Sequence, residues 1–341
     1  MKNAPFTILK LIAILCFSSI FSTNTESKGE FKIIEMGQQV DPISKESFDL
    51  YTRSLVTSQD GFVYVPTLLG FRMYEILTGN KTKDISFPPT GKGCLASANN
   101  RGKIELSQNE KYLVMQAFCQ IVQVDAKTGA IQRVLFNLDK DGFSTHSFAV
   151  SPDENILAVS TNYCIACIWN LKTNKLIVAY TPGFEKYGDL TFSSDGKILL
   201  IAGNNIWFQE KNQLKKFKSY IKNVILTNAG YNISFLSSNR SFISSGDDRD
   251  VIQKNTLTGD VLVRYKTGVR TDTFALSPNE NLVATGGYDD TRIRLFNAKT
   301  GKLIKIFEGH TKLIYALAFS KDNKKLISSS LDHTIRIWNI N

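Results

Sequence analysis

Phe319-Ser320-Lys321-Asp322-Asn323 is the clearest copy of a short pattern that recurs along this chain of 341 residues. In each copy a hydrophobic residue or Thr precedes a Ser, and the second residue after that Ser is Asp or Asn. Asp, Asn and Gly tolerate the left-handed backbone conformation that tight turns require. The seven serines, which follow one another at intervals of 40 to 49 residues, are Ser58, Ser107, Ser151, Ser193, Ser237, Ser277 and Ser320.

Hydrophobic, β-branched runs flank each copy, as Ala318-Phe319 and Leu326-Ile327 do around the last one. A second turn signal, of the form Ala298-Lys299-Thr300-Gly301, follows the third hydrophobic run of several units. Turns between strands that recur about every 40 to 45 residues are typical of a β-propeller. The sequence therefore predicts an all-β, seven-bladed propeller over residues 31–341.

The last unit ends with its third strand, at Trp338-Asn339, so it lacks an outer strand. One unassigned β-like stretch, residues 31–36, precedes the first unit. An open ring would leave hydrophobic blade faces and strand edges in water. We expect residues 31–36 to complete the last blade and to close the ring.

Residues 1–22 have the composition of a leader. Lys2 and Lys10 precede a short apolar run that ends at Phe21, and small residues follow. This order predicts a secretory signal peptide over residues 1–22, a short linker over residues 23–30, and an exported protein that is secreted or periplasmic. An uncleaved signal anchor is the alternative, although the run is shorter than the roughly 20 residues that span a membrane.

The last unit resembles the WD40-repeat family. It contains Gly309-His310, then a strand that ends at Leu331-Asp332, then a strand that ends at Trp338-Asn339. In that family a His, a Ser or Thr, an Asp and a Trp form a structural hydrogen-bonded tetrad. The resemblance places it on His310, Ser328 (or Ser330), Asp332 and Trp338, and it implies that His310 and Asp332 are not a catalytic dyad.

The same resemblance implies a function in binding. WD40 propellers dock proteins or peptides on one face, around a central channel, without catalysing a reaction. Aromatic and Arg side chains on a rigid rim are the types that anchor interfaces. The residues of this kind at the turn between the second and third strands are Tyr163, Arg249, Tyr288 and His333.

A propeller enzyme, a hydrolase or lyase with a metal in the channel, is the alternative. It would require His and carboxylate ligands from several blades, but the chain has only three histidines, none at metal-ligand spacing. Residues 137–142 resemble a calcium loop, but Phe148 stands where the last acidic ligand belongs. No catalytic residue, metal or cofactor is expected.

The net charge of +10 suggests an anionic partner, or simply a lysine-rich surface. Export argues against nucleic acid, so an acidic surface is the remaining option of this kind.

Four cysteines follow the leader: Cys94, Cys119, Cys164 and Cys167. Cys164 and Cys167 lie in one expected strand, too far apart to bridge each other. Cys94 and Cys119 fall near the positions of the His and Asp that the second unit lacks. We expect them to form a disulfide, with Cys119 to Cys164 as the competing pair.

Overall fold

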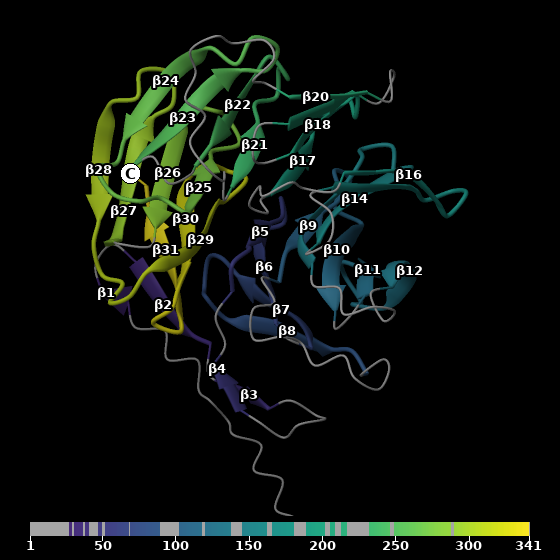
Figure 1. Cartoon of the computed structure of the whole chain (residues 1–341). Coiled ribbons are helices and arrows are strands. Elements are labelled where there is room, and N and C mark those ends of the chain that lie inside the picture. Colours follow the sequence, from purple (N-terminus) through teal and green to yellow (C-terminus); the bar gives the residue numbers. More distant parts are fainter. Residues whose placement is uncertain are drawn as a thin grey trace, which may run out of the picture.

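The structure, a computed structural model, describes residues 27–28, 31–36, 38–40, 47–49, 52–67, 69–88, 102–117, 120–137, 145–161, 166–180, 189–201, 205–208, 213–216, 232–245, 249–287 and 290–340. Every regular element in these ranges is a β-strand. The strands form six sheets of four consecutive strands, one sheet of five strands and a two-stranded hairpin (Figure 1).

The innermost strands are β5 (Val56–Thr57), β9 (Ile104–Leu106), β13 (Thr145–Val150), β17 (Leu190–Phe192), β21 (Ile233–Phe235), β25 (Thr273–Leu276) and β29 (Ile314–Phe319). The second strands are β6 (Phe62–Pro66), β10 (Tyr112–Ala117), β14 (Ile156–Thr161), β18 (Ile198–Ile201), β22 (Ser241–Ser244), β26 (Leu282–Gly287) and β30 (Lys325–Ser330). The third strands are β7 (Gly70–Glu75), β11 (Gln120–Asp125), β15 (Ala166–Asn170), β19 (Asn205–Phe208), β23 (Asp250–Asn255), β27 (Asp290–Asn297) and β31 (Thr334–Asn339). The fourth strands are β8 (Lys81–Ser86), β12 (Ile131–Asn137), β16 (Lys175–Tyr180), β20 (Gln213–Lys216), β24 (Val261–Lys266), β28 (Leu303–Phe307) and β2 (Phe31–Glu35).

The two ends of the chain meet in the five-stranded sheet. Its β2 pairs antiparallel with β31, and Phe31 lies opposite Trp338. Figure 1 shows this N-terminal strand in purple beside the yellow C-terminal strands. The expected closure of the last unit by residues 31–36 is therefore confirmed. The all-β propeller is confirmed as well. Six four-stranded blades correspond to six of the seven predicted units, and the strands of the last unit lie in the five-stranded closing sheet.

A further strand, β1 (Ser27–Lys28), pairs with β2 and extends the closing sheet. It lies within residues 23–30, the segment expected as a short linker, whose bounds stay a prediction. Between β2 and β5 the chain forms a hairpin of β3 (Gln38–Val40) and β4 (Ser47–Asp49). The expected signal peptide, residues 1–22, lies outside the described residues. Among those described, no helix is long and apolar enough to cross a membrane.

Hydrophobic clusters join each sheet to the next around the whole ring. Successive residues of a strand face opposite sides of its sheet, so each sheet contributes to two clusters. In β6, for example, Val63 packs toward Ile335 of the closing sheet, and Tyr64 packs toward Leu113 of the next sheet. The other five junctions have their own clusters. Burial on both faces of every sheet is what holds the ring together.

The recurring Ser-x-Asp/Asn pattern forms the turn between the first and second strands. In the fourth unit the Ser193 hydroxyl donates to Asp195 at 2.6 Å and accepts from the amide of Ile198 at 3.0 Å. Gly196 then adopts a φ of 72°, which closes the turn. This hydroxyl bond holds the pKa of Asp195 below its ordinary value, so the carboxylate remains an acceptor.

The fifth unit differs from the prediction by one residue. The amide of Leu236 donates to Ser241 and its carbonyl accepts from Asn239, as Ser193 does with Ile198 and Gly196. Leu236 therefore occupies the position expected for Ser237. The pattern matched here by chance because two serines, Ser237 and Ser238, precede Asn239.

Candidate functional site

The innermost strands surround a cavity of about 720 Å³ at the centre of the ring. Its lining comes from all seven inner strands and from the residues that enter them. Because a strand alternates its side chains, one set packs between the sheets and the other set faces the cavity. The residues of the first set are hydrophobic and buried, and all of them except Phe148 also border the cavity: Leu55, Ile104, Phe148, Leu190, Ile233, Phe274 and Leu317.

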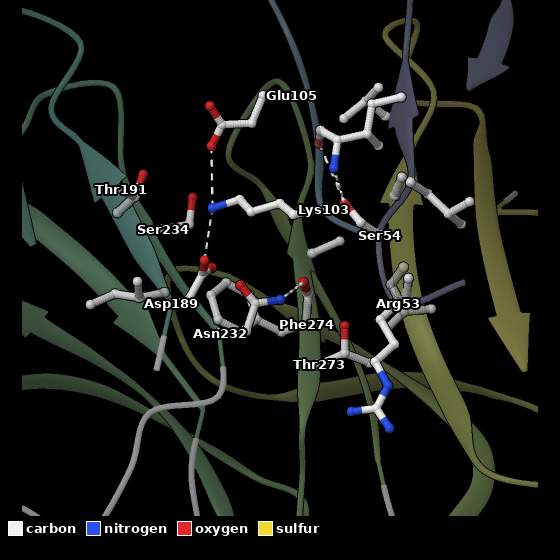
Figure 2. A pocket seen from close by; sticks show the side chains of 18 of the residues that line it. Arg53, Ser54, Lys103, Glu105, Asp189, Thr191, Asn232, Ser234, Thr273 and Phe274 are labelled. Carbon is white, nitrogen blue, oxygen red and sulfur yellow. Dashed lines mark hydrogen bonds and ion pairs between the residues drawn. The ribbon is translucent and has the colours of Figure 1, made fainter. Parts of the chain in front are cut away.

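The cavity-lining set is mostly polar or small. The residues just before the buried set are Ser54, Lys103, Ser147, Asp189, Asn232, Thr273 and Ala316. The residues just after it that line the cavity are Val56, Glu105, Thr191, Ser234, Ala275 and Ala318. Figure 2 shows ten of the lining residues by name. The side chains of the wall are thus held by paired strands. Charged and hydroxyl side chains line some blades, and small side chains line others.

Lys103 joins three neighbouring blades on one side of the cavity. Its ammonium group lies 2.7 Å from Asp189 and 3.2 Å from Glu105, and it donates to the Ser147 hydroxyl at 3.1 Å. It also donates to the carbonyl of Leu190 at 2.9 Å. Figure 2 shows the Lys103 side chain reaching between the two carboxylates. This cluster connects the second, third and fourth blades through one cation.

In this cluster burial disfavours the charged forms of the side chains, and ion pairing favours them. Burial lowers the pKa of Lys103, but Asp189 and Glu105 outweigh it, and the net pKa is above the ordinary value. Burial raises the pKa of Glu105, and Lys103 reverses this only in part. The cluster therefore depends on Lys103 remaining charged.

Replacing Lys103 by Met is expected to lower the free energy of unfolding by about 1–3 kcal/mol, because two carboxylates would then lack their cation. This figure lies below that of a fully buried pair because the Lys103 and Asp189 side chains are 20% and 19% exposed. Urea unfolding measures the change. The double variant Lys103→Met/Asp189→Asn should recover part of the loss, and a double variant no more stable than the single one would contradict this account.

Two arginines line other parts of the wall: Arg270 lies across the ring from the Lys103 cluster, and Arg53 lies on the first blade, next to the second blade that carries Lys103. Arg53 precedes β5, and its guanidinium lies 4.6 Å from the centre of the Tyr315 ring of β29. Arg270, in the loop before β25, pairs with Asp272 at 3.2 Å. Gly287 places this loop, since a Cβ atom there would lie 2.2 Å from the carbonyl oxygen of Arg270. The sequence pattern missed both arginines because they lie before the strands rather than in the turns.

The residues expected on the binding rim are only partly described. Arg249 is exposed at the turn before β23, and its carbonyl accepts from Thr267 at 2.6 Å. His333 is half-buried, with a φ of 63°, and its carbonyl accepts from the amide of Met36 at 2.9 Å. Tyr163 and Tyr288 lie outside the described residues. Arg249 and His333 do not line the cavity.

Four side chains of the last unit form a buried chain of hydrogen bonds. Trp338 Nε1 donates to Ser328 Oγ at 2.8 Å, and Ser328 Oγ lies 2.7 Å from His310 Nε2. His310 Nδ1 lies 2.8 Å from Asp332 Oδ2. Asp332 also accepts from the amides of Thr311 and Thr334, each at 3.0 Å. Ser330 instead donates to the carbonyl of Lys312 at 3.1 Å, so the tetrad serine is Ser328.

Residues 301–339, which contain this tetrad, match the family model described as WD domain, G-beta repeat. The last unit is a WD40 repeat. The chain as a whole is a WD40 β-propeller. A chain in the crystal structure of a mitotic checkpoint complex has the same fold, with a TM-score of 0.68 at 13% identity, over 100% of this chain and 99% of that one.

Curated relatives agree with the WD40 assignment. Apoptotic protease-activating factor 1 of Danio rerio is 23% identical over 302 residues, which are 85% of this chain and 22% of that protein. Periodic tryptophan protein 2 of Arabidopsis thaliana is 25% identical over 175 residues, which are 51% of this chain and 19% of that protein. The WD40 propeller thus spans about a fifth of the length of these relatives.

Asp332, His310 and Ser328 of the WD40 repeat have the linear order of a catalytic triad. Ser328 is nevertheless 0% exposed, and its hydroxyl is held between His310 and the indole N–H of Trp338. A nucleophile must reach its substrate, and this hydroxyl has no access to one. The arrangement stabilises the blade, because each buried polar group in it has a partner.

Burial lowers the pKa of His310, and the nearby Asp332 opposes this without reversing it. Burial also raises the pKa of Asp332, but its hydrogen bonds from His310, Thr334 and Thr311 outweigh the burial and keep that pKa low. The carboxylate is therefore ionised and the imidazole neutral at neutral pH. Nδ1–H then donates to Asp332, and Nε2 accepts from Ser328.

The stability of the WD40 propeller should fall as the pH is lowered below about 6.5, the ordinary pKa of histidine. Below that pH the unfolded chain binds a proton at His310 that the folded chain resists, so protonation favours unfolding. Urea unfolding between pH 8 and pH 5 measures this slope. His310→Gln should be less stable at pH 8 and should show a flatter slope, and an equal slope in both proteins would refute the assignment.

The remaining sequence expectations concern cysteines and calcium. Cys167 of β15, which belongs to neither of the two expected pairs, is disulfide-bonded. Its partner lies outside the described residues, as do Cys94, Cys119 and Cys164, so the expected pair Cys94–Cys119 stays a prediction. Residues 138–142 of the calcium-like loop are also outside the described residues. Phe148 is buried to 1% exposure, and no cluster of three metal-ligating side chains occurs among the residues described.

Proposed function

We propose that this protein is a non-catalytic docking platform that binds a protein or peptide partner at the mouth of its central channel. The observation that carries the proposal is the 720 Å³ cavity, whose wall is contributed by every inner strand of the ring. Side chains on paired strands are held in place, so a partner finds a preformed surface. WD40 propellers bind protein partners, which supports this choice over catalysis.

Filling the cavity tests the proposal. Thr191 lines the cavity from β17, and Thr191→Trp would place a large side chain there. Leu262→Trp on the outer strand β24, where Leu262 is 51% exposed, adds the same ring away from the cavity. Purified wild type and both variants, checked for equal melting temperature, are used to capture partners from the exported fraction of the source cells.

We expect one protein to be retained by the wild type and by Leu262→Trp and to be lost with Thr191→Trp. Equal capture by all three proteins would show that the cavity is not the docking site. Metal analysis of the same samples covers the enzyme alternative, since stoichiometric bound metal would favour a hydrolase or lyase over a platform.

We also propose that the protein is exported after cleavage of residues 1–22, with a membrane-tethered form as the alternative. The composition of that segment and the disulfide of Cys167 support export, because disulfides persist in oxidising compartments. Intact mass spectrometry of the protein from its source tests this. A mature chain should begin between about residues 20 and 28, and retention of Met1 would indicate an anchor.

A further inference from the structure

The charges around the cavity are unevenly balanced. On one side, Lys103 is paired with Asp189 and Glu105. On the other side, Arg270 is paired with Asp272. Arg53 lines the same cavity, and no carboxylate among the residues that the structure describes lies within ion-pair distance of it. The last lining cation, Lys321, follows β29, whereas Arg53 precedes β5, so these two lie at opposite ends of the channel.

The ring of Tyr315 orients Arg53 without neutralising it. The guanidinium carbon lies 4.6 Å from the ring centre, within the range of a cation–π contact. A guanidinium held over an aromatic ring keeps N–H groups at its edge for hydrogen bonds. Because Arg53 belongs to the first blade and Tyr315 to the closing sheet, the pair lies at the junction where the two ends of the ring meet.

The wall beside Arg53 carries no charged side chain on the inner strands β25 and β29. The residues of these two strands that line the cavity are Thr273, Phe274, Ala275, Leu276, Tyr315, Ala316, Leu317, Ala318 and Phe319. The Lys103 cluster, which belongs to the second, third and fourth blades, is different, because its charged groups are paired with one another. Figure 2 shows Arg53 beside Thr273 and apart from the two carboxylates of Glu105 and Asp189. A negative group that enters the cavity would therefore find Arg53 available, whereas Lys103 is already paired.

We propose that Arg53 is the specificity-determining residue of the docking site and that it binds the carboxylate of an Asp or Glu side chain of the partner. The planar fork of an arginine matches a carboxylate with two parallel hydrogen bonds. Arg53 is exposed where it lines the cavity, so a carboxylate of the partner can reach it. This inference rests on the proposed function, because it assigns the chemistry of the segment that enters the channel.

Selection from a phage-displayed library of random twelve-residue peptides tests the inference, since such a library contains carboxylates and no phosphates. The library is panned against immobilised wild type, Arg53→Met and Arg264→Met. Arg264 lies on the outer strand β24 and is 51% exposed, so its replacement removes the same charge away from the cavity. Equal melting temperatures exclude misfolding as the cause of any difference.

We expect peptides from wild type and Arg264→Met to share one enriched Asp or Glu position, and this enrichment to vanish with Arg53→Met. A selected peptide should bind at least about tenfold more weakly when its acidic residue becomes Asn or Gln, as for the loss of a charged hydrogen bond. Equal acidic enrichment on Arg53→Met, or retained peptides without an acidic position, would overturn the inference alone. Failure of wild type to retain any peptide would overturn both the inference and peptide docking.

Discussion

Ser328→Val is expected to lower the free energy of unfolding by about 3 kcal/mol or more, because a buried group without its hydrogen-bond partner costs about 1–3 kcal/mol. The substitution leaves two such groups without their partner, His310 Nε2 and Trp338 Nε1. Val has nearly the volume of Ser plus one methyl group, so the change tests hydrogen bonding more than packing. Urea unfolding followed by tryptophan fluorescence measures it.

The matched control is Ser237→Ala, which removes a hydroxyl from an exposed turn of the fifth blade. That change should stay within about 0.5 kcal/mol, as for surface substitutions generally. Equal stability of Ser328→Val and the control would show that the tetrad does not stabilise the last blade. Replacing Trp338 by Phe should cost less stability in Ser328→Val than in the wild type, because Ser328→Val has already broken that bond. An equal cost in both backgrounds would contradict the hydrogen-bond assignment.

Deleting residues 31–36 is expected to abolish the cooperative unfolding transition. The deletion removes β2 from the closing sheet and leaves the edge of β31 without its partner strand. It also removes Ile34 and Met36 from the cluster between the closing sheet and the first blade. A ring whose ends are not joined exposes that cluster to water, so the loss exceeds that of any single side chain.

A substitution keeps this prediction testable if the deletion variant fails to fold. Ile34→Ala should cost about 2–5 kcal/mol, as for other large-to-small core changes, because Ile34 is 0% exposed. Glu35→Ala, one residue further along the same strand, is exposed and should have little effect. A deletion variant that melts like the wild type would show that β2 is not needed for closure.

The regular parts of the fold were predictable from the sequence because they depend on local turn chemistry. A Ser hydroxyl, an Asp or Asn two residues later and a residue that tolerates positive φ make the same turn in nearly every unit, as at Ser151 and Asp153. Asn297 likewise accepts from the amides of Lys299 and Thr300, which explains the second turn signal. Each of these hydrogen bonds spans only a few residues, so the local sequence determines it.

The candidate site was less predictable because its contacts join residues far apart in the sequence. Lys103 and Asp189 are 86 residues apart, and their pairing depends on how far round the ring each blade lies. One signal could have found them: both occupy the position four residues before the turn Ser, where the inner strand faces the cavity. The fifth unit shows the opposite failure. Its residues match the Ser-x-Asn pattern at Ser237, but the hydrogen bonds of the turn begin one residue earlier, at Leu236.

Photo-crosslinking from the cavity wall tests the docking account most directly. Benzoylphenylalanine is placed at Ser234, which lines the cavity, or at Leu262 on the outer strand β24, and each protein is irradiated with an extract of the source cells. The account predicts a crosslinked partner from position 234, competed by unlabelled wild type, and none from position 262. A crosslink from position 262 with none from position 234 would place the partner on the outer edge and contradict docking at the channel.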